Sequence, residues 1–440
     1  MSAHPFVERI EAAPLARPYG RVRKVANGYF EASGPVCTVG DICAIESDGD
    51  AGSILAEVAS ADEAGLILVP LEQDRPVRPR ARVYGLPLGD AFAVGPGFAG
   101  RAIDALGRPI DGGGAIAATG RAPINGTVPR PLDRTAPAQV VATGIRAIDG
   151  LLPLAVGQRI GIFAASGVGK TSLLEQLAGQ IECDRCVLCL VGERGREVEG
   201  IWRQLSQRKD ADRFTLVAAT SDESAALRVR SANAALSLAE YWRDQGEHIV
   251  LVIDSVTRLA MALREIGLAS GEPPTVRAYT PNVFAALPRL VERCGAVRSG
   301  GAITAVMTVL SETDDVDDPI VEVMKSLLDG HIVLSRKLAE RGHFPAIDVP
   351  RSISRQAPRL MAPAHAAAAR EAIAMLGTYE EARLLIESGM YKKGASPEID
   401  RAIEMRDRLS GFLRQRQDEN PGFGASVGAL RSVTSGAVTA

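Results

Sequence analysis

Apolar runs and helix-like segments alternate through the middle of this chain, and this alternation limits its fold more than any other feature. The apolar runs are residues 159–164, 186–191, 214–219, 248–253, 302–310 and 331–334. After the first run, four apolar residues recur at the spacing of one helical face, namely Leu173, Leu174, Leu177 and Ile181. Strands that alternate with helices in this way form a parallel sheet covered by helices on both faces. The sequence therefore predicts an α/β fold in its central part.

The segment before this core has a different pattern. Residues 20–77 contain short apolar runs at 42–45, 54–58 and 66–71, separated at close intervals by Gly, Asp and Ser. This spacing is typical of a small antiparallel β-barrel. Residues 75–82 then combine two prolines with four arginines, which indicates a linker between domains.

The segment after the core lacks strand signals. Beyond residue 357, stretches such as 380–387 and 397–415 are rich in Ala, Glu, Arg and Leu and predict helices. The last stretch, 419–440, is rich in Gly, Ser and Ala, and we expect it to be disordered. The predicted domains are an N-terminal β-barrel (1–77), an α/β core (78–357) and a C-terminal helical domain with a disordered tail (358–440).

The composition excludes several classes of protein. With 46% hydrophobic and 23% charged residues among 440, the chain resembles neither an intrinsically disordered protein nor an integral membrane protein. The net charge of −3 provides no general basic surface, so we expect no nucleic-acid partner and at most peripheral association with a membrane. Residues 1–30 contain no secretory signal, and six cysteines are too few for a disulfide framework. The expected location is therefore cytoplasmic.

A loop between the first strand and the first helix of the core predicts a phosphate-binding site. The loop reads Ala164-Ala165-Ser166-Gly167-Val168-Gly169-Lys170-Thr171 and is followed by Ser172. It matches the P-loop pattern G-x-x-x-x-G-K-[ST], except that Ala164 replaces the first glycine. Gly167 and Gly169 still allow backbone N–H groups to converge on phosphate oxygens at the N-terminus of the helix. We expect Lys170 to contact the β and γ phosphates and the Thr171 hydroxyl to bind Mg²⁺.

Two acidic residues at strand ends add groups that hydrolysis requires. The run 248–254, HIVLVID, ends in Asp254, as does a Walker B strand whose carboxylate orients Mg²⁺. Glu193 follows another apolar strand and is a candidate to accept a proton from an attacking water. Glu197 lies close by, and position along the strand does not rank one glutamate over the other.

Several longer runs resemble one known family. They are VGERGREVEG (191–200), IDSVTRLAMALREIGLASGEPP (253–274), DDPIVEVMKSLLDGHIVLSR (317–336) and HFPAIDVPRSISR (343–355). Together they closely resemble the flagellar and type III secretion export ATPases, which are relatives of the catalytic β subunit of rotary ATP synthases. Two earlier runs, GRAIDALGRPIDG (100–112) and ATGIRAIDG (142–150), resemble segments that precede the nucleotide domain in the same superfamily. The resemblance implies a RecA-like P-loop core with ATP and Mg²⁺ as ligands.

The resemblance also implies roles for individual residues. Glu193 occupies the position of the family's catalytic base. Arg355 ends the S-[IV]-S-R run, whose arginine acts across a subunit boundary on the neighbour's nucleotide. Phe344 matches an aromatic residue that contacts adenine, and Arg194 is implied to position the γ-phosphate. An arginine that acts in trans requires a head-to-tail interface that closes as a ring, and the family is hexameric.

The leading hypothesis is an ATP hydrolase that energises protein export by the flagellar type III secretion apparatus as a homohexamer. The injectisome secretion ATPase is the alternative with nearly the same core. A rotary synthase β-type subunit is less favoured, because residues 377–394 lack the acidic lever loop of that subunit. An RNA-dependent helicase would need a basic surface with aromatic residues, and only 4% of the residues are aromatic. A non-catalytic nucleotide-binding subunit would lack the glutamate that Glu193 supplies.

The same resemblance implies partners at the cytoplasmic face of the export apparatus. These are regulatory and stalk-like export proteins, the membrane export gate, and exported proteins with their chaperones. Near the N-terminus, Phe6, Val7 and Ile10 share one helical face and are candidates for docking a regulatory partner. A loosely ordered chain end is the alternative interpretation of that segment.

Overall fold

The computed structural model describes residues 18–47, 52–72, 76–86, 91–298, 300–310 and 318–435. Phe6, Val7 and Ile10, the candidate docking face, lie outside the described residues. The chain divides into two compact units. The first comprises residues 1–91, 222–229 and 262–283, and the second comprises residues 92–221, 230–261 and 284–440.

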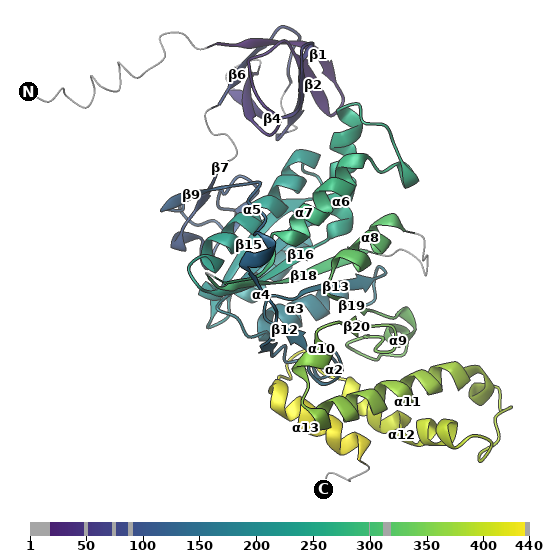
Figure 1. Cartoon of the computed structure of the whole chain (residues 1–440). Helices are drawn as coiled ribbons and strands as arrows, with labels where there is room; N and C mark the ends of the chain where they lie inside the picture. The colour runs from purple at the N-terminus through teal and green to yellow at the C-terminus, as the bar shows by residue number, and fades with distance from the viewer. Residues whose placement is uncertain are drawn as a thin grey trace, which may run out of the picture. The chain divides into compact units, whose positions relative to one another are not determined.

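The first unit contains a closed antiparallel β-barrel (Figure 1). Its strands are β1 (Gly20–Ala26), β2 (Tyr29–Ala32), β3 (Ile42–Glu46), β4 (Ser53–Asp62), β5 (Gly65–Pro70) and β6 (Arg82–Gly85). Apolar side chains such as Val22, Val58 and Leu68 fill its interior. The barrel that the sequence predicts is therefore confirmed. Its expected end at residue 77 is wrong, because β6 pairs with both β1 and β3 and completes the barrel only at Gly85.

The second unit is built on a mainly parallel sheet. Its main strands are β8 (Ala102–Asp104), β13 (Arg159–Ala164), β14 (Arg185–Glu193), β15 (Phe214–Thr220), β16 (His248–Asp254), β18 (Ala302–Leu310), β19 (Gly330–Val333) and β20 (Ile353–Ser354). They lie in the order β20-β19-β13-β18-β16-β14-β15-β8, and β20 is antiparallel to β19. The six core strands that the sequence predicts are all present in this sheet.

Short strands extend or flank the sheet. They are β7 (Ala91–Val94), β9 (Gly120–Pro123), β10 (Arg134–Thr135), β11 (Val140–Val141), β12 (Leu154–Ala155) and β17 (Gly295–Val297). β17 pairs with β18 and with β10, while β7 pairs with β9 and β11 with β12. Short 3-10 helices lie at Pro96–Phe98, Pro131–Asp133, Ala211–Arg213 and Val276–Ala278.

Both faces of the main sheet are buried, which explains why its strands read as continuous apolar runs. Along β14, Leu188 and Leu190 point to one face and Val187 and Cys189 to the other, and all four are at most 3% exposed. Helices α3 (Lys170–Gln180) and α4 (Gly195–Ser206) pack on the first face, and α5 (Ala225–Arg243) lies on the other (Figure 1). The further helices are α2 (Arg146–Leu151), α6 (Val256–Ala269), α7 (Pro281–Glu292), α8 (Pro319–Leu327), α9 (Arg336–Glu340) and α10 (Ala357–Leu360).

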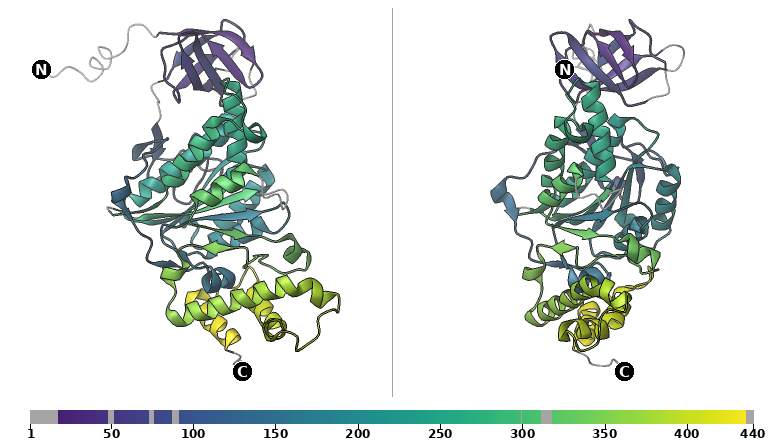
Figure 2. Two further views of the ribbon diagram at one scale, coloured as in Figure 1. Left: turned by 45° about the vertical axis from the view of Figure 1, so that its right-hand side comes forward. Right: turned by 90° about the vertical axis from the view of Figure 1, so that its right-hand side faces the viewer.

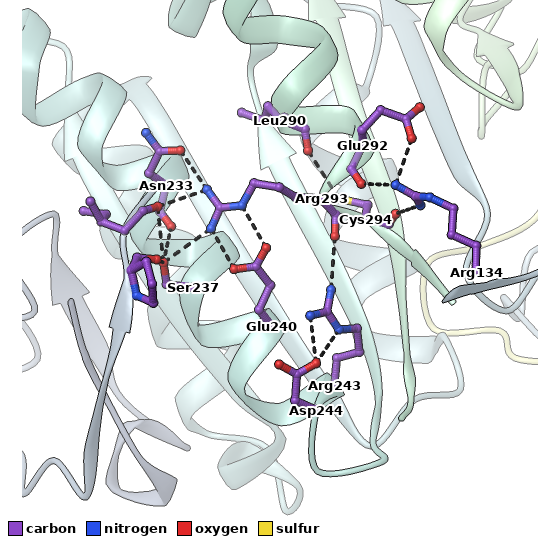
Figure 3. Close-up of polar contacts among 12 residues, drawn as sticks. Arg134, Asn233, Ser237, Glu240, Arg243, Asp244, Leu290, Glu292, Arg293 and Cys294 are labelled. Atoms are coloured by element: carbon purple, nitrogen blue, oxygen red, sulfur yellow. Dashed lines mark hydrogen bonds and ion pairs between the residues drawn. The ribbon is translucent and has the colours of Figure 1, made fainter. Parts of the chain in front are cut away.

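A buried ion pair fixes α5 to the segment that follows α7. Arg293 is 2% exposed, and its Nε and Nη2 each lie 2.8 Å from a carboxylate oxygen of Glu240 on α5. Its Nη1 donates to the Ile124 carbonyl and to Asn233 Oδ1, both at 3.0 Å. Figure 3 shows this guanidinium between Glu240 and Asn233. A buried charge with this many partners is fully hydrogen-bonded, so removing either partner would be costly.

The chain ends in a group of helices, as the sequence predicts. They are α11 (Pro363–Glu387), α12 (Pro397–Leu413) and α13 (Gly422–Thr434). Figure 2 shows α11 and α12 side by side in both of its views. Met405, Leu409 and Phe412 of α12 belong to the same apolar cluster as the sheet face on which α3 and α4 pack. Among the helices in the described ranges, none is both long and apolar enough to cross a bilayer.

The expectation of a disordered tail from residue 419 is wrong for most of that stretch, because α13 is an ordered, packed helix. Ser426, Leu430 and Thr434 form its buried face. The Ser426 and Thr434 hydroxyls donate to carbonyls one turn earlier at 2.9 and 3.2 Å, which allows them to be buried. Leu430 packs near Gly150 of α2, where a Cβ atom would lie 3.6 Å from Leu430 in ordinary contact but only 2.9 Å from the Phe412 ring of α12, so glycine permits the close approach of that ring.

Candidate active site

The phosphate-binding loop lies where the sequence predicts it. β13 ends at Ala164, and α3 begins at Lys170. Gly167 and Gly169 have φ of +77° and +89°, a left-handed conformation that residues with a Cβ rarely adopt. Within the described ranges, no side chain caps the N-terminus of α3. Its first N–H groups can therefore receive an anion, and the backbone fits a phosphate.

The side chains of the loop differ in what they can offer to a ligand. Ala164 and Val168 are 2% and 1% exposed, so these residues present only backbone atoms. Ser166 is exposed at the tip of the loop, and Thr171 and Ser172 lie in the first turn of α3. The predicted contacts of residues 164–172 with a nucleotide would accordingly come from backbone N–H groups and from a few polar side chains.

Lys170 lies directly against Asp254. Lys170 Nζ contacts Asp254 Oδ1, and the Thr308 hydroxyl donates to the same oxygen at 2.6 Å. Asp254 is the last residue of β16 and is 2% exposed. β13 and β16 both flank β18, so two parallel strands deliver the loop and the carboxylate to one edge of the sheet. The structure thus brings together the predicted lysine and the predicted metal-binding carboxylate.

Glu193 lies in the same cluster. It is the last residue of β14 and is 5% exposed. Its Oε1 lies 3.5 Å from Lys170 Nζ, and its Oε2 lies 3.2 Å from Arg258 Nη2. Burial raises the pKa of Glu193 and the negative charge of Asp254 raises it further, whereas Lys170 and Arg258 lower it. A carboxylate with a raised pKa is a stronger proton acceptor, so this environment suits a general base.

Arg258 is a site residue that the sequence analysis did not identify. It lies in the first turn of α6, donates to the Gly192 carbonyl and pairs with Glu193. Arg194, the arginine that the resemblance implied, is exposed at the N-cap of α4. One feature of the sequence could have indicated Arg258. It follows Asp254, the last residue of β16, by only four positions and therefore stays near the carboxyl ends of the strands.

A pocket of about 890 Å³ opens beside the loop. Phe344 lines it and is 46% exposed. A Cβ atom at Gly169 would lie 3.1 Å from the ring of Phe344, so the ring and the loop are neighbours. Leu173 and Gln176 of α3 line the pocket as well. An exposed aromatic ring beside a phosphate loop suits a stacked nucleobase, in agreement with the role expected of Phe344.

A second wall of this pocket comes from the segment after α12, which the sequence analysis also missed. Residues 414–419 all line the pocket. The backbone N of Gln415 donates to the Phe344 carbonyl at 2.9 Å. Gln180 of α3 donates to the Gln417 carbonyl at 2.8 Å. These contacts join segments more than 60 positions apart, so no local pattern could have indicated them.

Arg355 lies at the opposite edge of the sheet from the loop. It follows β20, and its backbone N donates to the Asp329 carbonyl at 3.0 Å. Asp329 in turn contacts Arg159, the first residue of β13. β13 has six residues, so at roughly 3.3 Å per residue its two ends lie about 16 Å apart. Arg355 is therefore too far away to act on a nucleotide bound to the loop of its own chain.

The fold and this site define a P-loop nucleotide-binding protein. The family described as "ATP synthase alpha/beta family, nucleotide-binding domain" matches residues 144–354. The family described as "T3SS EscN ATPase C-terminal domain" matches residues 361–432.

Individual relatives match the chain from end to end. It is 42% identical over 437 residues to the flagellum-specific ATP synthase of Bacillus subtilis (strain 168), with 99% of both chains covered. It is 40% identical over 428 residues to the type 3 secretion system ATPase of Xanthomonas euvesicatoria, with 96% of both covered. The chain belongs to the family of flagellum-specific ATP synthases and type III secretion ATPases, as the sequence runs indicated.

Solved structures agree with this assignment. The assembled ATPase EscN from the enteropathogenic E. coli type III secretion system has a TM-score of 0.89 and 39% identity. That match covers 94% of this chain and 100% of the other. EscN in complex with its central stalk EscO gives a TM-score of 0.85 at 38% identity, again covering 94% of this chain.

Proposed function

We propose that this chain hydrolyses ATP with Mg²⁺ and that a homohexameric ring of it energises protein export by the flagellar type III secretion apparatus. The observation that carries the proposal is the buried Glu193 carboxylate, 3.5 Å from Lys170 of the phosphate loop. A nucleotide-binding subunit without catalytic activity would not need a buried carboxylate at this place.

Each residue of the site has a separate role in the proposed hydrolysis. Loop N–H groups and Lys170 hold the phosphates and offset the charge that develops on the γ-phosphate. Glu193 accepts the proton of the attacking water, while Arg258 holds the carboxylate through Oε2. Thr171 and Asp254 provide the hydroxyl and carboxylate oxygens that Mg²⁺ prefers, and the bound ion supplies electrostatic stabilisation of the phosphate oxygens. Phe344 stacks on the adenine.

Arg355 acts on the nucleotide of a neighbouring copy in this account. Its side chain is exposed, and it lies at the edge of the sheet away from its own loop. A head-to-tail arrangement that closes as a ring brings one edge of each copy against the loop edge of the next. The existence of an assembled form of EscN, a relative of 39% identity, supports such a ring.

The proposed site of action is inferred by analogy with the family. We place the ring at the cytoplasmic face of the export apparatus, beside a stalk-like protein comparable to the EscO that EscN binds. Regulatory export proteins, the membrane export gate and exported proteins with their chaperones are the further partners of this proposal. Deleting the gene should abolish secretion of flagellar subunits. Loss of needle secretion with intact flagella would instead assign the chain to an injectisome.

A mixing experiment tests action in trans. Arg355→Ala should still bind ATP and form rings but lose hydrolysis by about 10³-fold or more, the effect of removing an arginine finger. Lys170→Ala should be inactive because it lacks its own phosphate contact. When the two variants are mixed, sites with an intact loop and an intact neighbouring arginine re-form, so activity should return. Mixed rings that stay inactive would contradict the proposal.

A further inference from the structure

Asp329 connects the Arg355 segment to the start of β13, because its backbone carbonyl accepts from the Arg355 backbone N at 3.0 Å and its carboxylate contacts Arg159. Its Oδ2 accepts from the backbone N and from Nε of Arg159, both at 3.0 Å, and its Oδ1 accepts from Nη2 at 3.2 Å. Both side chains are largely buried, at 18% and 21% exposed. A bidentate arginine–carboxylate pair of this kind fixes the relative orientation of the two side chains as well as the distance between them.

Gln158, the residue before Arg159, makes further contacts with Asp329 and with the residue before Arg355. It is 0% exposed, and its Nε2 donates to Ser354 Oγ at 3.1 Å and to the Asp329 carbonyl at 3.4 Å. Ser354 directly precedes Arg355. Consecutive residues at one end of β13 therefore contact both β20 and the residue before β19.

Arg159 is itself fixed from its far side. Its Nη1 lies 2.7 Å from Glu292 Oε1 at the end of α7. Glu292 Oε2 lies 2.9 Å from Arg134 Nη2, and Arg134 Nη1 donates to the Cys294 carbonyl at 3.0 Å (Figure 3). Because Arg159 pairs with the carboxylates of both Asp329 and Glu292, its side chain has little freedom to move away from Asp329.

We propose that Arg159 and Asp329 are positioning residues that hold Arg355 in place for the neighbouring copy. In this arrangement β13 carries the phosphate loop of one copy at its C-terminal end and supports, at its N-terminal end, the arginine offered to the next copy. The inference rests on the proposed function, in which Arg355 acts in trans. Displacing a catalytic group by about 1 Å costs on the order of 10²-fold in rate, so the loss of this support should be measurable.

The first experiment separates rate from binding. In Asp329→Asn the carbonyl that contacts Arg355 remains while the charged acceptor is lost, so kcat should fall by about 10- to 100-fold. The KM for ATP should stay within about threefold, because the loop is intact. Arg159→Lys, which keeps the charge but loses the two-pronged contact, should show a smaller loss in the same direction.

A matched control lies at the same edge of the sheet. Glu247 forms a comparable ion pair with Arg185 at 2.8 Å, on β14 and far from β20 in the strand order. Glu247→Gln should keep the kcat of the unmodified protein. An equal fall in kcat for Glu247→Gln and Asp329→Asn would show a general loss of fold stability and overturn the inference.

The second experiment uses mixed rings. If Asp329 acts through Arg355, Lys170→Ala should restore activity to Asp329→Asn as it does to Arg355→Ala, because the Lys170→Ala copies supply a well-positioned arginine. An unimpaired Asp329→Asn, or a loss that mixing does not restore while Arg355→Ala is restored, would overturn the inference and leave the proposed function intact. Failure to restore Arg355→Ala itself would contradict the proposed function, and this inference with it.

Discussion

Glu193 Oε2 lies 3.2 Å from the Arg258 guanidinium, at the end of a strand that lies beside the strand ending in Asp254. The contact occupies one carboxylate oxygen and leaves the other on the side of Lys170. Residues of this chain thus orient the Glu193 carboxylate, the proposed base, and the arginine that contacts it is Arg258 of α6 rather than Arg194, the neighbour of Glu193 in sequence.

Removing the charge of Glu193 should separate binding from turnover. Glu193→Gln keeps nearly the same shape, so ATP binding should be retained, while kcat should fall by about 10²- to 10⁴-fold. Steady-state phosphate release and equilibrium nucleotide binding measure the two effects. Glu199→Gln is a matched control, because Glu199 is an exposed glutamate on the adjacent α4. Unchanged turnover in Glu193→Gln would remove this residue from the mechanism.

Arg258→Ala should change the pH dependence of turnover. The positive charge of Arg258 lowers the pKa of Glu193, so its removal should raise that pKa. Since the base works only when deprotonated, the acidic limb of the kcat profile should move to higher pH, and kcat should fall by about 10- to 100-fold. Arg203→Ala on the exposed surface of α4 should leave the limb in place. A limb that does not move in Arg258→Ala contradicts this role.

Phe344→Ala should weaken nucleotide binding selectively. Base stacking on an aromatic ring contributes about 1–3 kcal/mol, which corresponds to a rise in the KM for ATP of roughly 5- to 150-fold. Phe344→Tyr, which keeps the ring, should remain near the original value. The preference for ATP over CTP should shrink in the alanine variant. A KM that is equal in all three proteins would show that the base binds elsewhere.

His343 should make the fold sensitive to mild acid. Its burial, and secondarily the positive charge of Arg414, lower the pKa of His343 from 6.5 to about 4. Between these values the unfolded chain binds more protons than the folded chain, so the free energy of unfolding should rise with pH. The loss from pH 7.5 to pH 5 should be about 2 kcal/mol. Urea unfolding at both pH values measures it.

A matched variant isolates this effect from the other groups that titrate in the same range. His343→Gln cannot gain a proton, so its stability should change with pH by about 2 kcal/mol less than that of the unmodified protein. Parallel pH profiles for the two proteins would contradict the assignment to His343.

Most elements that could be predicted from the sequence are continuous apolar runs or a recognised loop motif. The six core strands, the loop before Lys170 and the strand ending in Asp254 could be located because burial on both faces produces continuous apolar runs. The helix α13 could not, because its packing depends on small residues such as Ser426 whose polarity is satisfied within the helix. Strand β6 was hidden for a related reason, since it is short and its pattern is interrupted by neighbouring prolines and arginines.

The candidate site was predictable where its residues lie at strand ends or in a loop motif. Arg258 and residues 414–419 were not, because they reach the site through helix packing and long-range contacts rather than through a pattern in sequence. The position of Arg355 shows the same limit. Its distance from its own loop depends on the register in which β20 pairs with β19 and β19 with β13, which only the structure reveals.

A structure of the assembled protein with Mg²⁺, ADP and a γ-phosphate mimic tests the central claim most directly. The measured quantity is the distance from the Arg355 guanidinium of one copy to the mimic bound at the loop of the next. We expect about 3 Å, the length of a hydrogen bond, with Arg355 released from the Lys325 carbonyl that it now contacts at 3.2 Å. Rings in which Arg355 stays on that carbonyl, away from every nucleotide, would contradict the account.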